Sequence, residues 1–284
     1  MRDPIGSERA AASEALSLEI EKANYFATAA RENWISFVSF ALFLIFWELI
    51  CRFEIVGPYQ LVPPSEVVTL FIDKFSNANP DGALLYQHAA ASLGLALAGF
   101  LAAVVIGVPL GLFMGWYPAV NMTARPLFDA IRPIPPIAWI PIAILWLGVA
   151  EGSKIFICFV GAFVIMILNA YTGMRYVDPL LIDAAKSFGA NRTQQFFNVA
   201  VPACMPSIFA GVQNALSMAW MCVLAAEMVG ARQGVGFIII QGMDLNKPAM
   251  ILVGMVLIGI IGSLLAATLR QAEKLLCPWR RELV

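Results

Sequence analysis

Residues 178–202 read DPLLIDAAKSFGANRTQQFFNVAVP, a polar stretch in an otherwise strongly apolar chain. The pattern predicts two short helices that meet at Gly189, where glycine provides the left-handed turn that commonly ends a helix. Asp178 is suited to cap the first helix with its carboxylate. Pro179 suits the first helical position, because its missing N–H would have had no intrahelical partner there.

The second helix of this stretch is expected to start at Asn191. Gln194 follows three residues later, which is the spacing of a capping box. Phe196 and Phe197 give this helix an apolar face. Proline disrupts a helix from within, so we expect the helix to stop at Pro202.

Composition places the chain in a bilayer. Of its 284 residues, 60% are hydrophobic and only 13% are charged, far from the balance of a soluble domain. The net charge of −1 gives no basic surface for nucleic acid. Five cysteines without CxxC spacing predict small buried thiols, and a single histidine, His88, cannot build a multi-histidine metal site. We therefore predict no catalytic residues, no metal site and no cofactor in this chain.

The expected fold is an all-α integral membrane protein with about six spans, since a helix needs about 20 mainly apolar residues to cross the hydrocarbon layer. Residues 1–33 form a polar tail, and residues 34–284 form the membrane domain, with a core at about 88–270. The third span is short and begins among prolines. The six candidate spans are Trp34–Cys51, Ser92–Trp116, Pro133–Leu147, Ile155–Tyr171, Ile208–Val229 and Ala249–Leu269.

The distribution of basic residues predicts the orientation. If both termini are cytoplasmic, 13 of the 18 lysines and arginines fall in inner segments and 5 in outer ones. Cytoplasmic loops carry such an excess of Lys and Arg. We therefore expect the tail, the C-terminus and the stretch 178–202 to face the cytoplasm.

The stretch also resembles a family signature. Asp183-Ala184-Ala185, then Gly189 after three residues, then Val199-Ala200-Val201-Pro202 after nine more, resembles the EAA loop of permease subunits of bacterial ABC importers. The family pattern is E-A-A, three residues, Gly, nine residues and I-x-L-P, so every spacing is kept. The departures, Asp for Glu and Val for Ile and Leu, conserve charge or apolar character.

The resemblance implies a type I ABC importer-like permease whose cytoplasmic coupling hairpin, residues 178–202, is held by an ATPase. Ala184 and Ala185 are small enough to let another protein approach the helix backbone, and Asp183 and Lys186 offer charges beside that contact. A solvated loop or a DNA-binding helix-turn-helix would also place a glycine between two helices. The predicted coupling residues are Asp183, Ala184, Ala185, Lys186, Ser187, Gly189, Ala190 and Arg192.

A proline-rich block enters the third span between Arg125 and Pro141. Prolines free backbone carbonyls, which are tolerated at membrane depth only against protein or a water-filled cavity. This block resembles the branch that includes taurine, alkanesulfonate, nitrate and bicarbonate importers, together with four shorter motifs: Leu145-Trp146-Leu147-Gly148, Gly152-Ser153-Lys154, Ala225-Ala226-Glu227 and Gly234-Val235-Gly236-Phe237. The candidate pathway residues are Arg132, Pro135, Pro136, Trp139, Trp220 and Glu227.

Each pathway candidate has a structural alternative. Glu227 could line the pore, reach the interface or pair with Arg232, because an ionisable group at membrane depth is a functional hypothesis by default. Arg132 could anchor at lipid head groups, and the two tryptophans could pack between helices. Glu48, four residues before Arg52, is expected to form an ion pair at a helix end.

The function implied by the resemblance is that of a permease subunit in the bacterial inner membrane, not an enzyme. Its partners would be an ATP-binding subunit dimer carrying ATP and Mg, a second permease that is either another copy, forming a homodimer, or a related subunit, and a periplasmic or lipid-anchored solute-binding protein. The substrate would be a small anion such as taurine, another sulfonate or nitrate, or alternatively an aromatic carboxylate or bicarbonate. The rival from another class is a stand-alone secondary transporter or channel.

Overall fold

The computed structural model describes residues 34–35, 37–57, 59–80 and 82–276, and its regular secondary structure over these residues is helical. The chain divides into two compact units, residues 1–66 and 67–284. The predicted tail, residues 1–33, lies outside the described residues. Helix α2 (Pro64–Asp73) crosses the boundary between the units.

The first unit contains a helix over residues 37–52, which overlaps the first predicted span. Near its end, Arg52 Nε donates a hydrogen bond of 2.9 Å to the Glu48 carboxylate. The same carboxylate accepts a hydrogen bond of 2.9 Å from the Ser65 hydroxyl. The predicted ion pair at the helix end is therefore confirmed.

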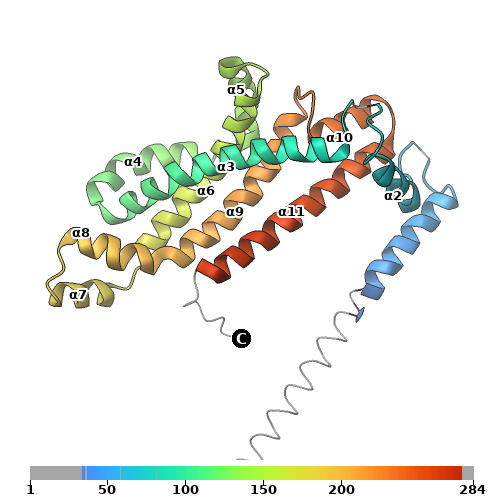
Figure 1. The fold of residues 1–284 in the computed structure, drawn as a ribbon. Helices are drawn as coiled ribbons and strands as arrows, with labels where there is room; N and C mark the ends of the chain where they lie inside the picture. Colours follow the sequence, from blue (N-terminus) through green and yellow to red (C-terminus); the bar gives the residue numbers. More distant parts are fainter. Residues whose placement is uncertain (1–33, 36, 58, 81, 277–284) are drawn as a thin grey trace, which may run out of the picture. The chain divides into compact units, whose positions relative to one another are not determined.

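The second unit is built around three long helices, with α6 (Glu151–Arg175) packed against both α3 (Leu85–Trp116) and α9 (Val201–Glu227) (Figure 1). A fourth long helix, α11 (Pro248–Leu276), packs on α9 and on a short helix before it. All four are long and apolar enough to cross a membrane. They correspond to the second, fourth, fifth and sixth predicted spans.

Glycines form the seam between α3 and α6. A Cβ added at Gly111 would lie 2.6 Å from the Ile167 carbonyl oxygen, and one at Gly115 would lie 2.5 Å from the Met174 Cβ. The two backbones therefore approach closely because α3 carries no side chains at these positions. This matches the role of small residues in membrane helix packing.

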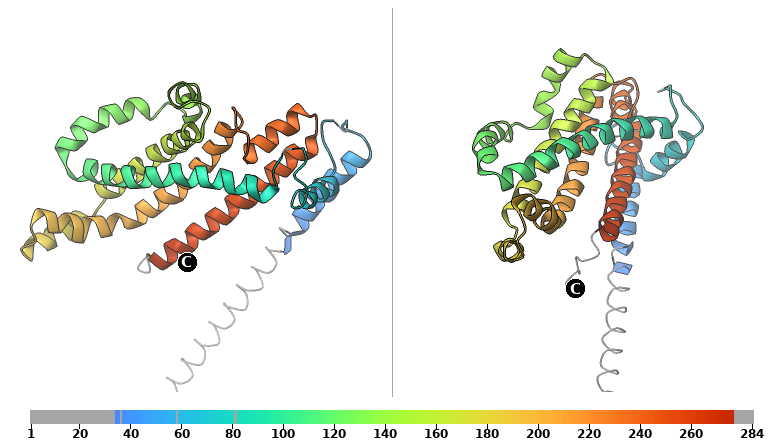
Figure 2. Two further views of the ribbon diagram at one scale, coloured as in Figure 1. Left: turned by 45° about the horizontal axis from the view of Figure 1, so that its top comes forward. Right: turned by 60° about the vertical axis from the view of Figure 1, so that its left-hand side comes forward.

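The third predicted span, Pro133–Leu147, is too short to cross a membrane by itself: it holds a 3₁₀ turn of 4 residues and a helix of 8 residues, and it follows another helix at a sharp bend. Helix α4 (Pro118–Ile131) is followed by η1 (Pro136–Trp139) and α5 (Ile140–Leu147), and the two segments are bent by 87° (Figure 2). The bend falls where Pro133, Pro135 and Pro136 remove three backbone donors from four consecutive positions, so the helix cannot continue. Counted as one broken span, the pair raises the number of membrane-crossing segments in the described residues to five at most.

The expected helix end at Pro202 is wrong. Helix α8 (Arg192–Gln194) continues through a π-helical segment, η2 (Gln195–Ala200), directly into α9. Inside a regular α-helix, the proline ring would clash with the carbonyl four residues before it, here that of Asn198. Because Asn198 lies in the wider π-helical turn, the helix changes register there and runs on through Pro202.

A further short helix, α10 (Val235–Asp244), was not anticipated from the sequence. It lies between α9 and α11 at the end of α6 away from residues 178–202 (Figure 1). Gly242 allows its close approach to α11, since a Cβ there would lie 2.9 Å from the Met250 Cβ.

Candidate functional site

The first half of the hairpin, residues 178–189, has the predicted local structure. Helix α7 (Pro179–Ser187) starts with Pro179, and the Asp178 carboxylate accepts a hydrogen bond of 2.8 Å from the Leu180 N–H. Gly189 follows the helix with a φ of +79°, in the left-handed region that disfavours other residues. The cap and the turn are thus both set by residues within the hairpin itself.

The second half starts with the predicted capping box. The Asn191 side-chain oxygen accepts a hydrogen bond of 2.8 Å from the Gln194 N–H, and the Gln194 side-chain oxygen accepts one of 2.9 Å from the Asn191 N–H. Gln195 also donates a hydrogen bond of 2.7 Å to the Ala190 carbonyl, which ties the turn to the following helix.

The predicted coupling residues surround the turn and are largely accessible. Lys186 donates a hydrogen bond of 2.8 Å to Asp183, so these two charges pair with each other on the surface of α7. Ala184, Ser187 and Arg192 are exposed, and Ala185 and Ala190 are half-buried.

Apolar residues on the same hairpin were not among the predicted contact residues. Phe188 is 91% exposed at the turn and Leu180 is exposed on α7, and Tyr176, just before the hairpin, is exposed as well. The signal available in the sequence was the presence of large apolar side chains in an otherwise polar stretch. Exposed apolar residues grouped in this way are typical of a surface that contacts a partner.

An aromatic cluster ties the hairpin to the end of α3. Phe196 in η2 is buried, and its ring centroid lies 5.6 Å from those of both Phe113 and Trp116. The Arg192 guanidinium lies over the Tyr117 ring, 5.1 Å from its centroid. A displacement of the hairpin would therefore act directly on the junction between α3 and α4.

Glu227 lies at the opposite end of the bundle, and it is only 1% exposed. Its carboxylate accepts hydrogen bonds from the Ser92 hydroxyl at 2.7 and 2.9 Å and from the Gly236 N–H at 2.9 Å. The Ser92 oxygen in turn accepts a hydrogen bond of 2.8 Å from the Val235 N–H. The carboxylate thus joins α3 and α9 to the first turn of α10, where backbone N–H groups favour a negative charge.

Gly234 is required for this arrangement. Its φ is +134°, and a Cβ there would lie 2.3 Å from the carboxyl carbon of Glu227. Its N–H donates a hydrogen bond of 3.0 Å to His88 Nδ1, which adds a second link between α3 and the start of α10.

The remaining pathway candidates lie in two separate places. Arg132 and Pro135 are exposed at the bend after α4, with Pro136 half-buried beside them. Trp139 packs on Phe156, with ring centroids 6.5 Å apart. Trp220 is buried between α9 and α11, where its indole N–H donates a hydrogen bond of 3.3 Å to the Ile258 carbonyl.

A search of the described residues for a metal centre finds no group of three or more His, Cys, Asp or Glu side chains arranged to hold an ion.

Comparison with known proteins adds a family and several relatives. Residues 107–281 match the family described as the binding-protein-dependent transport system inner membrane component. The chain is 36% identical to a putative ABC transporter permease protein of Methanocaldococcus jannaschii, over 85% of this chain and 90% of the relative. It is 32% identical to the taurine transport system permease protein of Escherichia coli, over 89% of this chain and 92% of the relative. A nitrate import permease protein of Synechocystis is 31% identical, over 85% of this chain and 88% of the relative.

Among solved structures, the chain resembles a subunit of the MetNI methionine ABC transporter, determined in inward-facing conformations. The TM-score is 0.60 at 20% sequence identity, over 66% of this chain and 94% of that one. At this level of identity, the likeness concerns the fold alone.

Proposed function

The chain belongs to the family of binding-protein-dependent transport system inner membrane components, and from this premise we propose how it couples ATP hydrolysis to import. It is an ABC importer permease of the inner membrane. This assignment excludes the alternative raised by the sequence, a stand-alone secondary transporter or channel. In our proposal, an ATP-binding subunit dimer binds the hairpin at residues 178–202. A second copy of the chain completes the permease, and a solute-binding protein delivers substrate from outside.

The observation that carries this proposal is the construction of the hairpin. Its two helix starts are capped from within, so the turn keeps its shape without help from the rest of the chain. Phe188 and Leu180 remain exposed around that rigid turn. We assign them, with Ala184 and Ala185, to the surface that the ATPase contacts.

The aromatic cluster around Phe196 would transmit the movement. Closure of the ATPase pair displaces the hairpin, and Phe196 passes the displacement to Phe113 and Trp116 at the end of α3. A packed contact of this kind moves as a unit, so the bundle shifts between discrete states. ATP and Mg are bound by the partner subunit, and this chain supplies no group to the hydrolysis.

The substrate we propose is a small anion. Relatives that align along most of the chain are named for taurine, nitrate and aliphatic sulfonates. The sulfonate group is tetrahedral and nitrate is planar, but each spreads one negative charge over three oxygens. One cationic environment with several hydrogen-bond donors would therefore suit both.

The test is ATP turnover of the assembled complex with Ala184→Arg, which adds a bulky charge to the exposed face of α7. We expect turnover to fall at least tenfold, or the ATPase to fail to copurify. Ala119→Arg is the matched control, because Ala119 is exposed in the first turn of α4, off the hairpin. Unchanged assembly and turnover in Ala184→Arg would refute the coupling proposal.

A further inference from the structure

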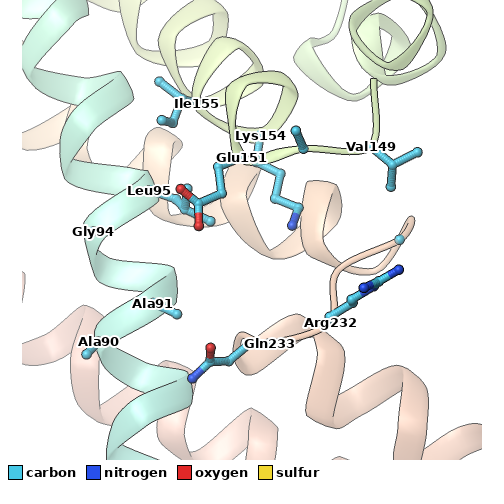
Figure 3. Close-up of a pocket in the computed structure, with 12 residues that line it drawn as sticks. Ala90, Ala91, Gly94, Leu95, Val149, Glu151, Lys154, Ile155, Arg232 and Gln233 are labelled. Atoms are coloured by element: carbon cyan, nitrogen blue, oxygen red, sulfur yellow. The ribbon is translucent and has the colours of Figure 1, made fainter. Parts of the chain in front are cut away.

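A pocket of about 660 Å³ lies at the first turn of α6, the end of that helix away from the hairpin, and Figure 3 shows the residues that line it. Its walls come from the start of α3, the loop before α6, the first turn of α6 and the loop between α9 and α10. Its polar lining consists of Glu151, Lys154, Arg232 and Gln233. The volume is within the range of small-molecule sites.

Lys154 is the unusual member of this lining. Its side chain is only 8% exposed, and its ammonium points into the pocket (Figure 3). Among the described residues, none forms a hydrogen bond with this ammonium, and no Asp or Glu oxygen lies within 4.0 Å of it. With so little of the residue exposed and the ammonium facing the pocket, the charge is only partly hydrated, and without an ion pair this costs free energy. Its position in the first turns of α6, the positive end of the helix dipole, adds to that cost.

Neither of the two nearby carboxylates, Glu227 and Glu151, forms an ion pair with Lys154. Glu227 is not part of the pocket lining, and although its charge attracts that of Lys154, the two form no ion pair; its oxygens accept hydrogen bonds from Ser92 and Gly236 instead. Glu151 is exposed on the wall, and it makes no ion pair with Lys154. The pocket lining therefore keeps an excess of one positive charge.

Arg232 and Gln233 bring further donors from the facing wall. Both side chains are exposed, and Figure 3 shows them on the loop across the pocket from α6. The loop lies close to the α5–α6 connection, since a Cβ at Gly230 would lie 2.7 Å from the Val149 side chain. Guanidinium groups donate several hydrogen bonds in a geometry that matches oxyanions.

We infer that this pocket binds the acid group of a small oxyanion, a sulfonate, nitrate or carboxylate, with Lys154 as its principal contact. Arg232 and Gln233 complete the donor set, and the remaining apolar lining, such as Leu95 and Ile155, accepts a short organic tail. The inference rests on the proposed import of small anions, and it gives the permease a solute contact of its own. The same chemistry would also accept a lipid phosphate.

The experiment is calorimetric titration of the purified permease–ATPase complex in phosphatidylcholine nanodiscs, without binding protein. Ethanesulfonate, taurine, nitrate and benzoate are the probes. We expect at least one to bind, and Lys154→Met to weaken that binding about tenfold or more, the value of one charge-assisted hydrogen bond. Lys154→Arg keeps the charge and the oxyanion donors, so it should bind the probe more tightly than Lys154→Met does. Lys247→Met is the matched control, because Lys247 is exposed in the α10–α11 connection and does not line the pocket.

The outcomes separate this inference from the coupling proposal. Failure of all four probes to bind the wild-type complex, or equal affinities in Lys154→Met and Lys247→Met, would overturn it. So would an anionic lipid that copurifies with the wild type, is lost in Lys154→Met and blocks the probes, because the site would then belong to lipid. ATP turnover should be unchanged by Lys154→Met without solute, whereas failure of the coupling proposal would be seen in Ala184→Arg.

Discussion

At the scale of single residues, the buried carboxylate of Glu227 explains how three helices meet inside an apolar bundle. A chain of hydrogen bonds runs from the Val235 N–H through the Ser92 hydroxyl to the carboxylate, which also accepts from the Gly236 N–H. Buried polar groups are tolerated when they are paired in this way. The carboxylate thereby substitutes for a local cap at the start of α10.

The first prediction concerns this carboxylate. Glu227→Ala should lower the free energy of unfolding by about 3–5 kcal/mol, because it leaves the Ser92 hydroxyl and the Gly236 N–H buried without their acceptor. The measurement is thermal unfolding of the purified permease, and Asp244→Asn, an exposed carboxylate at the end of α10, should unfold like the wild type. If Glu227→Ala instead kept full stability and only lost transport, the residue would act in the pathway.

Residues with local partners were predictable and residues with distant partners were not. The Asp178 cap and the Asn191–Gln194 box each depend on residues at most three positions away, so spacing alone identified them. Ser92 lies 135 positions from Glu227, and no local pattern connects the two. The sequence therefore left the role of Glu227 open between pore and structure, and it did not suggest that Lys154 lies beside it.

At the scale of helices, the glycine ladder of α3 fixes how closely that helix packs on α6. A four-residue repeat keeps Gly107, Gly111 and Gly115 on one face, and all three face α6 at short distances. A repeat of this kind can be recognised in a sequence because helical periodicity is regular. The bend after α4 could be predicted only in part: prolines indicate that a helix is interrupted, but they do not specify the angle, which is 87° here.

The second prediction compares two glycines within long apolar helices. Gly111→Ala places a methyl group 2.6 Å from the Ile167 carbonyl oxygen, so it should destabilise the protein by about 1–3 kcal/mol. Gly259→Ala in α11 meets no atom within 4 Å and should be neutral or stabilising by up to about 1 kcal/mol. Parallel thermal unfolding curves check this, and equal effects of the two changes would contradict the close seam.

The third prediction tests the aromatic cluster that joins the hairpin to α3. Phe196→Ala removes the ring that packs on Phe113 and Trp116, and it should reduce solute-stimulated ATP turnover about tenfold or more while the ATPase still copurifies. Phe197→Ala removes a neighbouring ring that is exposed, and should keep most of the stimulation. Equal stimulation in both variants would show that the cluster does not transmit the movement.

At the scale of the whole molecule, the hairpin and the cationic pocket mark opposite ends of α6. Its 25 residues span about 37 Å at 1.5 Å per residue, which exceeds the roughly 30 Å of a bilayer's hydrocarbon core. The hairpin follows the last residue of α6, and the pocket lies at its first turn. One helix therefore links the proposed ATPase contact on one face of the membrane to the proposed solute contact on the other.

The fourth prediction is the orientation that this arrangement requires. Ser187→Cys and Lys247→Cys are introduced one at a time into a chain whose Cys51 and Cys277 are replaced by serine. Both new cysteines are at exposed positions, on the hairpin and on the α10–α11 connection, whereas Cys158, Cys204 and Cys222 are buried and should react little. With intact cells whose outer membrane has been made permeable, a membrane-impermeant maleimide should label Lys247→Cys at once. It should label Ser187→Cys only after the inner membrane is opened. The opposite labelling would place the hairpin outside, away from ATP, and neither the coupling mechanism nor the excess of inner basic residues would then hold.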